Sequence, residues 1–358
     1  MSRMITYRDA LNEAMVEEMR RDSGVFTYGI DVADHKRIFN STKGLVEEFG
    51  PDRCFSTPLA EDAMTGFGLG AAINGMRPVH VHMRVDFLLL GLNQLVNMIA
   101  THHYGSGGTM KVPMVIRAII GRGWGQSYQH SKALHSWFAH VPGLKVVMPS
   151  TPRDAKGMLI AAIRDDNPVV FIEHRWLYDA VGEVPEDCGT ISLEGARVLR
   201  PGKDITVVGT SWMNVEAIRA AQILEKHGVD VEVVDVRSIS PFDSKTIIDS
   251  VKKTGHCVVA DNDWVHCGFS AEVAAAVYEA CYKQLKSPVA RIGYAPVPCP
   301  CTRPLEDEFY PNAIDIIRSV ETKLGLKPID LAGAIPNSRA KSSAVCSMGQ
   351  KGPLNLFS

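Results

Sequence analysis

Short apolar strands alternate with amphipathic helices along most of this chain, and that order most constrains its fold. Residues 112–120, "VPMVIRAII", form a nearly continuous apolar run, typical of a strand buried on both faces of a parallel sheet. Helical periodicity marks Tyr7 to Arg21 and residues 151–166, and a second apolar strand follows at 167–174. Parallel strands need long, usually helical, crossovers, so this order predicts an open, doubly wound α/β sheet.

The chain has 358 residues, too many for one ordinary core, so we expect two domains. The first α/β pattern covers residues 1–185, and a Gly-, Pro- and charge-rich linker follows at 186–203. A second α/β pattern begins with "DITVVGTS" and covers 204–326. Regular patterning fades after that, and we expect residues 327–358 to be an extended or disordered tail.

Charge and cysteine usage exclude several classes of function. The net charge is -2, with no basic arm, which gives no electrostatic support for binding nucleic acid or a membrane surface. The N-terminus becomes polar at once and no apolar run reaches the length of a bilayer. The eight cysteines are scattered without zinc-ribbon spacing. We therefore expect a cytoplasmic protein with reduced thiols.

A helix predicted over residues 61–74 begins with two acids, Glu61 and Asp62. Thr57 at the cap, Pro58 at the first helical position and the helix dipole would explain acids at this place. They do not explain the glycines that follow, each of which costs roughly 1 kcal/mol relative to alanine inside a helix. These glycines are Gly66, Gly68, Gly70 and Gly75. We expect another surface, either a packed element or a bound cofactor, to approach this helix closely.

The irregular segment "GRGWGQSYQH" follows the buried strand at 112–120, where open α/β sheets build their sites. Arg122 suits a carboxylate or phosphate and Trp124 suits the wall of an apolar pocket, but a loop anchored by one buried aromatic explains both equally well. His130, His135 and His140 are spaced five apart, about 140° apart on a helix, which disfavours a three-histidine metal site. His130 remains a candidate acid–base group or substrate ligand.

Four separated blocks of the sequence resemble the beta subunit of thiamine-diphosphate-dependent 2-oxo acid dehydrogenases. These blocks, which agree in order and spacing, are residues 56–79, 83–97, 143–174 and 204–243. The resemblance covers about Met4 to Leu326. It implies a pyrimidine-binding thiamine diphosphate domain followed by a transketolase C-terminal-like domain. The implied activity is decarboxylation of a small 2-oxo acid with transfer of the acyl group to lipoamide.

The resemblance also implies roles for individual residues. Glu61 falls on the glutamate that hydrogen-bonds the aminopyrimidine of the cofactor and promotes ionisation of its thiazolium carbon. Phe87 falls on the aromatic residue that stacks on the pyrimidine, and Met83 on a residue that lines the same cleft. His130 falls on a histidine near the reacting carbon, suited to steer a substrate carboxylate or to move protons.

A potassium site, formed mostly by backbone carbonyls, is implied as well. It would comprise Met114, Ala162, Ile163, Asp165 and Asn167. Judged on residue type alone, Asp165 and Asn167 are typical of a helix stop followed by a turn.

The GDG motif that binds the diphosphate and magnesium in this family does not occur in the chain. In members with split subunits the motif lies on a separate alpha subunit. The resemblance therefore implies an α2β2 heterotetramer that is active only with its alpha partner, which would hold magnesium, and a lipoyl acyltransferase core as a further partner.

Three departures from the family pattern leave the substrate open. The loop before His130 is bulkier and carries Arg122 and Trp124, Val85 replaces a usual aromatic residue, and "DNDWVHCG" at 261–268 replaces a glycine-rich turn. Arg122, Trp124 and His130 are the candidate substrate ligands. A split transketolase-like enzyme or carboligase, which transfers its unit to a sugar or aldehyde without a lipoyl partner, remains the alternative.

Overall fold

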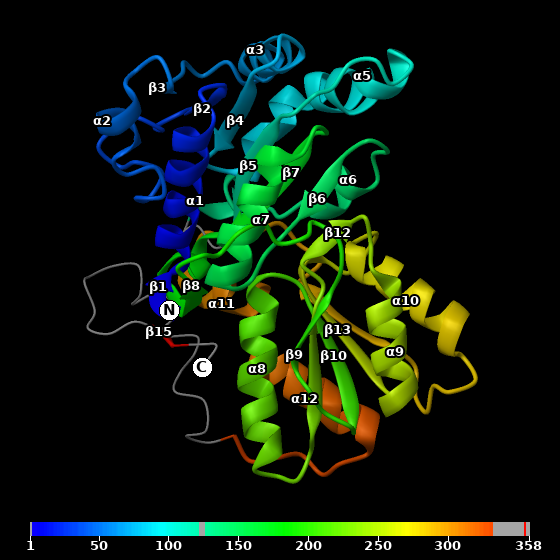
Figure 1. The fold of residues 1–358 in the computed structure, drawn as a ribbon. Coiled ribbons are helices and arrows are strands. Elements are labelled where there is room, and N and C mark those ends of the chain that lie inside the picture. The colour runs from blue at the N-terminus through cyan, green and yellow to red at the C-terminus, as the bar shows by residue number, and fades with distance from the viewer. Residues whose placement is uncertain (1, 122–125, 332–353, 356–358) are drawn as a thin grey trace.

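Two open α/β sheets, one above the other in Figure 1, form the protein and confirm the predicted fold class. The structure is a computed structural model that describes residues 2–121, 126–331 and 354–355. Arg122 and Trp124, the two loop residues expected to bind substrate, lie outside these ranges.

The first sheet contains, among the described residues, seven strands in the order β12-β6-β7-β5-β4-β2-β3. Adjacent strands are parallel except at the edge, where β12 runs antiparallel to β6. In spatial order the bounds are β12 Ser238–Ser240, β6 Lys145–Val147, β7 Val169–His174, β5 Val115–Ile120, β4 Arg77–His82, β2 Val25–Gly29 and β3 Cys54–Ser56. The helical segments between them are α1 Tyr7–Arg21, α2 Leu45–Phe49, α3 Glu61–Ile73, α4 Val85–Leu88, α5 Ala100–Gly105, α6 His135–Ala139 and α7 Pro152–Arg164.

Strand β5 shows why this sheet is covered on both faces. Val115 and Ile119 pack into the core that α1 and α7 share with the sheet, whereas Ile116 and Ala118 pack on the opposite face with α3 and α6. Successive side chains of a strand point to opposite faces, so a strand covered on both sides must be apolar throughout. Helix α1 spans the predicted range, and the Thr6 hydroxyl accepts a hydrogen bond from the Asp9 N–H to cap it.

The predicted cap of the acidic helix is wrong. Helix α3 begins at Glu61 itself, with Ala60 at the cap and no side-chain capping bond. Thr57 lies too early in the chain to cap it: its N–H donates to the Gly29 carbonyl (3.1 Å), which continues the pairing of β2 with β3, and the helix starts four residues later.

The single long helix expected from Phe87 to Tyr104 is also wrong in detail. The helical path starts at Val85 with α4, tightens into a 3-10 turn, η1 (Leu89–Gly91), and then widens into a π-helical stretch, η2 (Asn93–Ile99), before α5. Gly91, in this 3-10 turn, lies close to α3, because a Cβ there would lie 2.7 Å from the Thr65 hydroxyl.

The second sheet has the order β14-β13-β10-β11-β9 within the described residues. Only the pairing of β9 with β11 is antiparallel among these pairs. Its strands are β14 Ala290–Tyr294, β13 Cys257–Trp264, β10 Ile205–Gly209, β11 Val231–Asp235 and β9 Arg197–Arg200. Its helices are α8 Trp212–Glu225, α9 Ser244–Thr254, α10 Phe269–Cys281, α11 Arg303–Phe309 and α12 Ala313–Leu324. Strand β9 lies in the range expected to be a linker.

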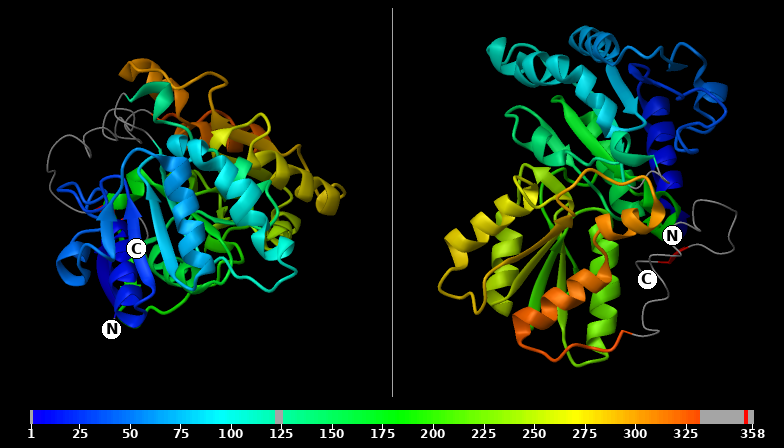
Figure 2. Two further views of the ribbon diagram at one scale, coloured as in Figure 1. Left: turned by 90° about the horizontal axis from the view of Figure 1, so that it is seen from above. Right: turned by 180° about the vertical axis from the view of Figure 1, so that it is seen from behind.

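Apolar cores join the two halves. Helices α8 and α12 cover one face of the second sheet, and α9 and α10 cover the other (Figure 2). The core on the α9 and α10 side contains Val208 and Val234 of the second sheet together with Ile116 of the first. Strand β12, which follows the second-domain strand β11, completes the first sheet. A small third sheet pairs β1 (Ser2–Thr6), β8 (Ala180–Pro185) and β15 (Leu354–Asn355).

Each helix in the described part of the chain is too short or too polar to cross a bilayer.

Asp235, at the end of β11, is fully buried where the halves meet. It accepts hydrogen bonds from the Ser150 hydroxyl, the Asn214 amide (2.8 Å) and the Arg237 N–H (3.1 Å). Burial raises the pKa of Asp235 to about 7, against the opposing effect of the Ser150 bond. The carboxyl group therefore keeps its proton in the folded chain at pH values where the unfolded chain has released it.

We expect stability to fall as pH rises from about 4 to 7, because the raised pKa favours folding only while Asp235 stays protonated. The contribution is roughly 1.4 kcal/mol for each pH unit in that window. Urea unfolding at pH 5 and pH 8 should show a steeper loss for the wild type than for Asp235→Asn, which keeps the shape without the titration. Equal pH slopes for both proteins would contradict this.

Candidate active site

Three of the predicted site residues come to one edge of the first sheet. Glu61 follows β3, Phe87 follows β4, and His130 follows β5. These strands are parallel, so their carboxyl ends lie at the same edge, where open α/β sheets bind ligands. The rings of Phe87 and His130 lie edge to face, with centroids 5.0 Å apart at 64°.

The segment that carries Phe87 passes close to the backbone of Glu61. A Cβ at Gly91 would lie 3.3 Å from the Glu61 carbonyl oxygen, which also accepts a hydrogen bond from the Thr65 hydroxyl within α3 (2.7 Å). Glu61 is only 9% exposed, whereas Phe87 is 36% exposed. A nearly buried carboxylate and an accessible aromatic ring at the same sheet edge suit a ligand that combines a flat ring with a polar edge.

The glycines of α3 have separate explanations. A Cβ at Gly68 would lie 2.2 Å from the Tyr28 hydroxyl and 2.5 Å from Met114, so this glycine lets α3 pack tightly on the sheet. Gly75 has a φ of +92° just past the helix end, and Gly70 faces open space. Close packing on the sheet, one of the two expectations, therefore holds at Gly68.

Met83, expected to line the same cleft, is half-buried and packs against the core on the α1 and α7 side of the sheet. The accessible ring of Phe87 lies instead beside His130. The structure therefore joins Phe87 and His130 directly and places Met83 toward the core.

A set of charged residues holds the His130 segment against the turn that carries Phe87. The buried Arg84 donates to the Gly121 carbonyl (3.2 Å) and to the Gln126 side chain (3.0 Å). The Lys132 ammonium donates to Asp86 (3.0 Å). Sequence reasoning missed these residues, although a charged pair between apolar residues in "MRVDF" was the available signal.

His174, at the end of β7, lies against Gly121, the first residue after β5. A Cβ at Gly121, whose φ is +100°, would lie 2.7 Å from the His174 ring, so only glycine lets the chain leave β5 across it. Burial, together with the nearby positive charges of Arg84 and Arg175, lowers the pKa of His174 to about 3. This imidazole is therefore neutral at physiological pH and lies against Gly121 as an uncharged group.

His135 lies five residues after His130, at the start of α6, and is fully buried between the two domains. Its Nε2 lies 3.0 Å from the Asp261 carboxylate at the end of β13. Burial opposes the charged imidazole, but Asp261, with Asp263 nearby, overcomes this and raises the pKa of His135. His135 had no predicted partner. The acids in the otherwise apolar strand that ends "ADNDW" were the available signal.

The five residues expected to bind potassium cluster around the end of α7. The Arg77 guanidinium donates to the carbonyl oxygens of Ile163 (3.0 Å) and Asp165 (2.9 Å). The Met114 and Ala162 carbonyls accept backbone N–H groups, and the Asn167 amide donates to the Asp165 carboxylate (3.1 Å). Helix α7 ends at Arg164 with Asp165 as its cap, which confirms the helix stop. Oxygen ligands suit potassium, but the Arg77 guanidinium already donates to two of these oxygens.

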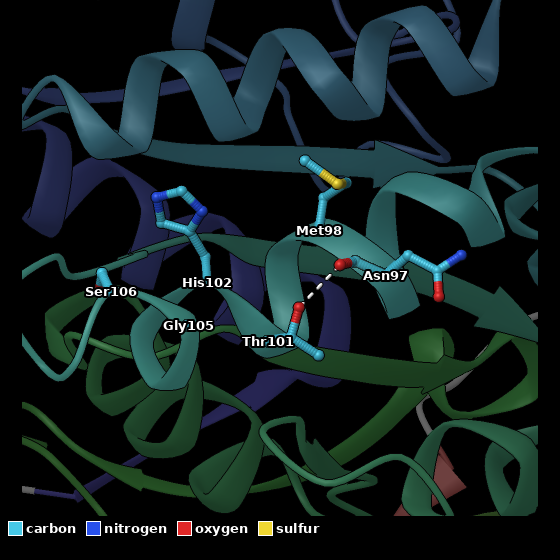
Figure 3. Close-up of a pocket in the computed structure, with 6 residues that line it drawn as sticks. All are labelled: Asn97, Met98, Thr101, His102, Gly105 and Ser106. Atoms are coloured by element: carbon cyan, nitrogen blue, oxygen red, sulfur yellow. Dashed lines mark hydrogen bonds between the residues drawn. The ribbon is translucent and has the colours of Figure 1, made fainter.

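Two shallow hollows lie elsewhere. One, of about 310 Å³, opens on a single helical face of η2 and α5, where the Thr101 hydroxyl donates to the Asn97 carbonyl (Figure 3). Its lining residues are Asn97, Met98, Thr101, His102, Gly105 and Ser106. The other, of about 410 Å³, is lined by Lys145, Ala161, Asp165 and residues 190–194. Glu61, Phe87 and His130 line neither of them.

Residues 3–180 match the family described as the transketolase pyrimidine binding domain, and residues 194–316 match the transketolase C-terminal domain. A solved structure described as a split gene transketolase, an inactive beta4 tetramer, has a similar fold. Its TM-score is 0.72 at 23% identity, over 90% of this chain and 99% of that chain.

Curated relatives are similar over most of the chain. The pyruvate dehydrogenase E1 component subunit beta of Rhizobium meliloti is 40% identical over 88% of this chain and 69% of its own length. The mitochondrial subunit of the same name from Ascaris suum is 38% identical over 90% of this chain and 91% of its own length. The acetoin:2,6-dichlorophenolindophenol oxidoreductase subunit beta of Cupriavidus necator is 40% identical over 88% of this chain and 96% of its own length.

Proposed function

Because this chain belongs to the beta subunits of the thiamine-diphosphate-dependent 2-oxo acid dehydrogenases, we propose that it completes a site for decarboxylation of a small 2-oxo acid and acyl transfer to lipoamide. The observation that carries this proposal is the meeting of Glu61 and the Phe87–His130 pair at one sheet edge. The likeness to the solved split transketolase, at 23% identity, supports the fold alone. The dehydrogenase subunits are 38–40% identical, so we favour their reaction over the transketolase-like alternative.

Each residue has a defined task in this proposal. Phe87 offers its accessible ring as a stacking surface for the pyrimidine, and Glu61 offers a carboxyl group to the polar edge of that ring. When bound, thiamine diphosphate supplies the nucleophilic carbon and the electron sink that decarboxylation requires. His130 orients the substrate carboxylate or moves a proton beside the reacting atoms, and Arg122 and Trp124 remain candidate substrate ligands. Met83 supports the cleft from the core side.

An alpha subunit would cover this edge of the sheet and supply the diphosphate and magnesium site. Leu59 is 80% exposed and Leu90 is 61% exposed, and they flank Glu61 and Phe87 in the chain. Phe67 is also exposed on α3, where Gly70 faces open space. Such apolar exposure around a partial site is typical of a surface that a partner buries. The same proposal includes an α2β2 assembly and a lipoyl acyltransferase core as partner. It also includes domain limits at 185 and 204 and a cytoplasmic location.

The test is co-expression with a GDG-containing alpha chain encoded in the same genome. We expect the purified pair to bind thiamine diphosphate with magnesium in calorimetry, and to acylate lipoamide reductively from one member of a panel of 2-oxo acids. Failure to bind the cofactor would overturn the assignment. Cofactor binding with turnover of acetoin or of a sugar acceptor, and none of any 2-oxo acid, would favour the alternative reaction.

Potassium at the end of α7 is part of the proposal, and it gives a separate prediction. Each carbonyl oxygen has a second lone pair, so the Ile163 and Asp165 carbonyls can serve both Arg77 and a cation. An ion that binds only the folded chain stabilises it by about 2.7 kcal/mol at one hundred times its dissociation constant. We expect the melting temperature to be higher in KCl than in NaCl or choline chloride of equal ionic strength. Equal melting temperatures in the three salts would contradict a potassium site, and the Arg77 guanidinium would then be the cationic group that binds these carbonyls.

A further inference from the structure

The segment that carries His130 continues directly into the contact between the two domains. Leu134 has a φ of +57°, which turns the chain, and His135 then enters the interface. Five residues after His130, the chain is therefore held by groups of the second domain.

Two carboxylates at the end of β13 bind two consecutive residues of that segment. Asp261 lies 3.0 Å from the His135 imidazole, and Asp263 accepts a hydrogen bond from the Ser136 hydroxyl (2.8 Å). Asp261 is itself held by the Thr210 hydroxyl (2.6 Å) and the Asn262 N–H (2.8 Å). The rings of His135 and Phe269 lie edge to face, with centroids 6.4 Å apart. The His135 end of the segment is thus attached to strand β13 of the second sheet.

The other end of the segment is attached to the first domain, through Arg84 to Gln126 and through Asp86 to Lys132. His130 lies between these attachments, against Phe87. A buried ion pair adds little net stability compared with an apolar pair, but it specifies one arrangement because its partners cannot be buried apart. A displacement of about 1 Å at a reacting group is enough to slow a reaction roughly a hundredfold.

We propose that His135 and Asp261 are positioning residues through which the second α/β domain holds His130 in register against Phe87. The proposal rests on the proposed function, since it assigns the second domain a part in the geometry of that same site. Neither residue touches the site, so both act through the six-residue path from His130 to His135.

The decisive experiment is a double-mutant cycle in the reconstituted alpha–beta complex. We expect His135→Ala to lower kcat roughly 10- to 100-fold, with thiamine diphosphate affinity within twofold of wild type because Glu61 and Phe87 are untouched. In a His130→Ala background the same substitution should lower kcat no further, since the group that it positions is absent. An equal fall in both backgrounds would overturn the proposal.

Milder variants keep the test decisive if His135→Ala does not fold. His135→Gln retains a donor for Asp261 and should recover most of kcat. Ser136→Ala removes only the bond to Asp263 and should lower kcat several-fold. The matched control is Lys253→Ala, which breaks the ion pair with the buried Glu232 inside the second domain and away from the His130 segment. We expect it to lower the unfolding temperature without changing kcat.

The outcomes separate the two proposals. A wild-type complex that binds no thiamine diphosphate overturns the proposed function. A wild-type complex that is active, with Ser136→Ala and both His135 variants at wild-type kcat, overturns the positioning role alone.

Discussion

We expect Glu61→Gln to lower turnover of the alpha–beta complex by roughly 10²- to 10⁴-fold, while the fold and cofactor binding persist. An amide is nearly the same size as the carboxyl group but is a very weak acid and base, and acid–base catalysis by one side chain contributes roughly 10²- to 10⁴-fold. Glu61 is nearly buried at the start of α3, so the same space is filled after the change. The measurements are kcat, calorimetric binding of thiamine diphosphate, and exchange of its thiazolium proton in deuterium oxide.

Asp62→Asn is the matched control, because Asp62 is the next residue of the same helical turn and is exposed. Its carboxylate accepts a bond from the Gln94 amide (3.3 Å). This variant removes the same charge near the same helix end but leaves Glu61 in place. We therefore expect wild-type turnover and proton exchange from it. Full activity of Glu61→Gln, or equal losses in both variants, would contradict the role of Glu61.

Arg117→Met destabilises the first domain by about 3–5 kcal/mol, the expected loss when one partner of a buried ion pair is removed. Arg117 and Glu173 are fully buried on neighbouring strands β5 and β7, and the guanidinium contacts both carboxylate oxygens, at 2.5 and 2.9 Å. The Tyr178 hydroxyl donates to the same carboxylate (2.5 Å). Without Arg117, Glu173 remains buried with a charge that nothing neutralises. Urea unfolding of the isolated chain measures the loss.

The double variant Arg117→Met with Glu173→Leu provides the control. Removing both charges leaves an apolar pair of similar volume, so we expect it to recover most of the lost unfolding free energy. A double variant that is no more stable than Arg117→Met would show that packing, and not the unpaired charge, causes the loss.

The elements could be predicted because their signals are local. The apolar run at 112–120 contains β5, the periodicity of residues 7–21 matches α1, and the polar turn after Arg164 ends α7. The same patterns predicted that Glu61, Phe87 and His130 would come to one sheet edge, because parallel strands bring their carboxyl ends together. Details that depend on neighbouring elements were missed, such as the start of α3, since Thr57 still pairs with Gly29 of β2 and the helix begins only at Glu61.

The amino-acid order alone determined the alternating α/β pattern and put Glu61, Phe87 and His130 after successive parallel strands, because both depend on periodicities of a few residues. Packing decided how these side chains are held. Lys132 meets Asp86 across 46 positions of the chain, and His135 meets Asp261 across 126. Such pairs have no periodic signal in the sequence. An unpaired charge becomes costly only when it is buried, so the partner is selected by the packing of the folded chain.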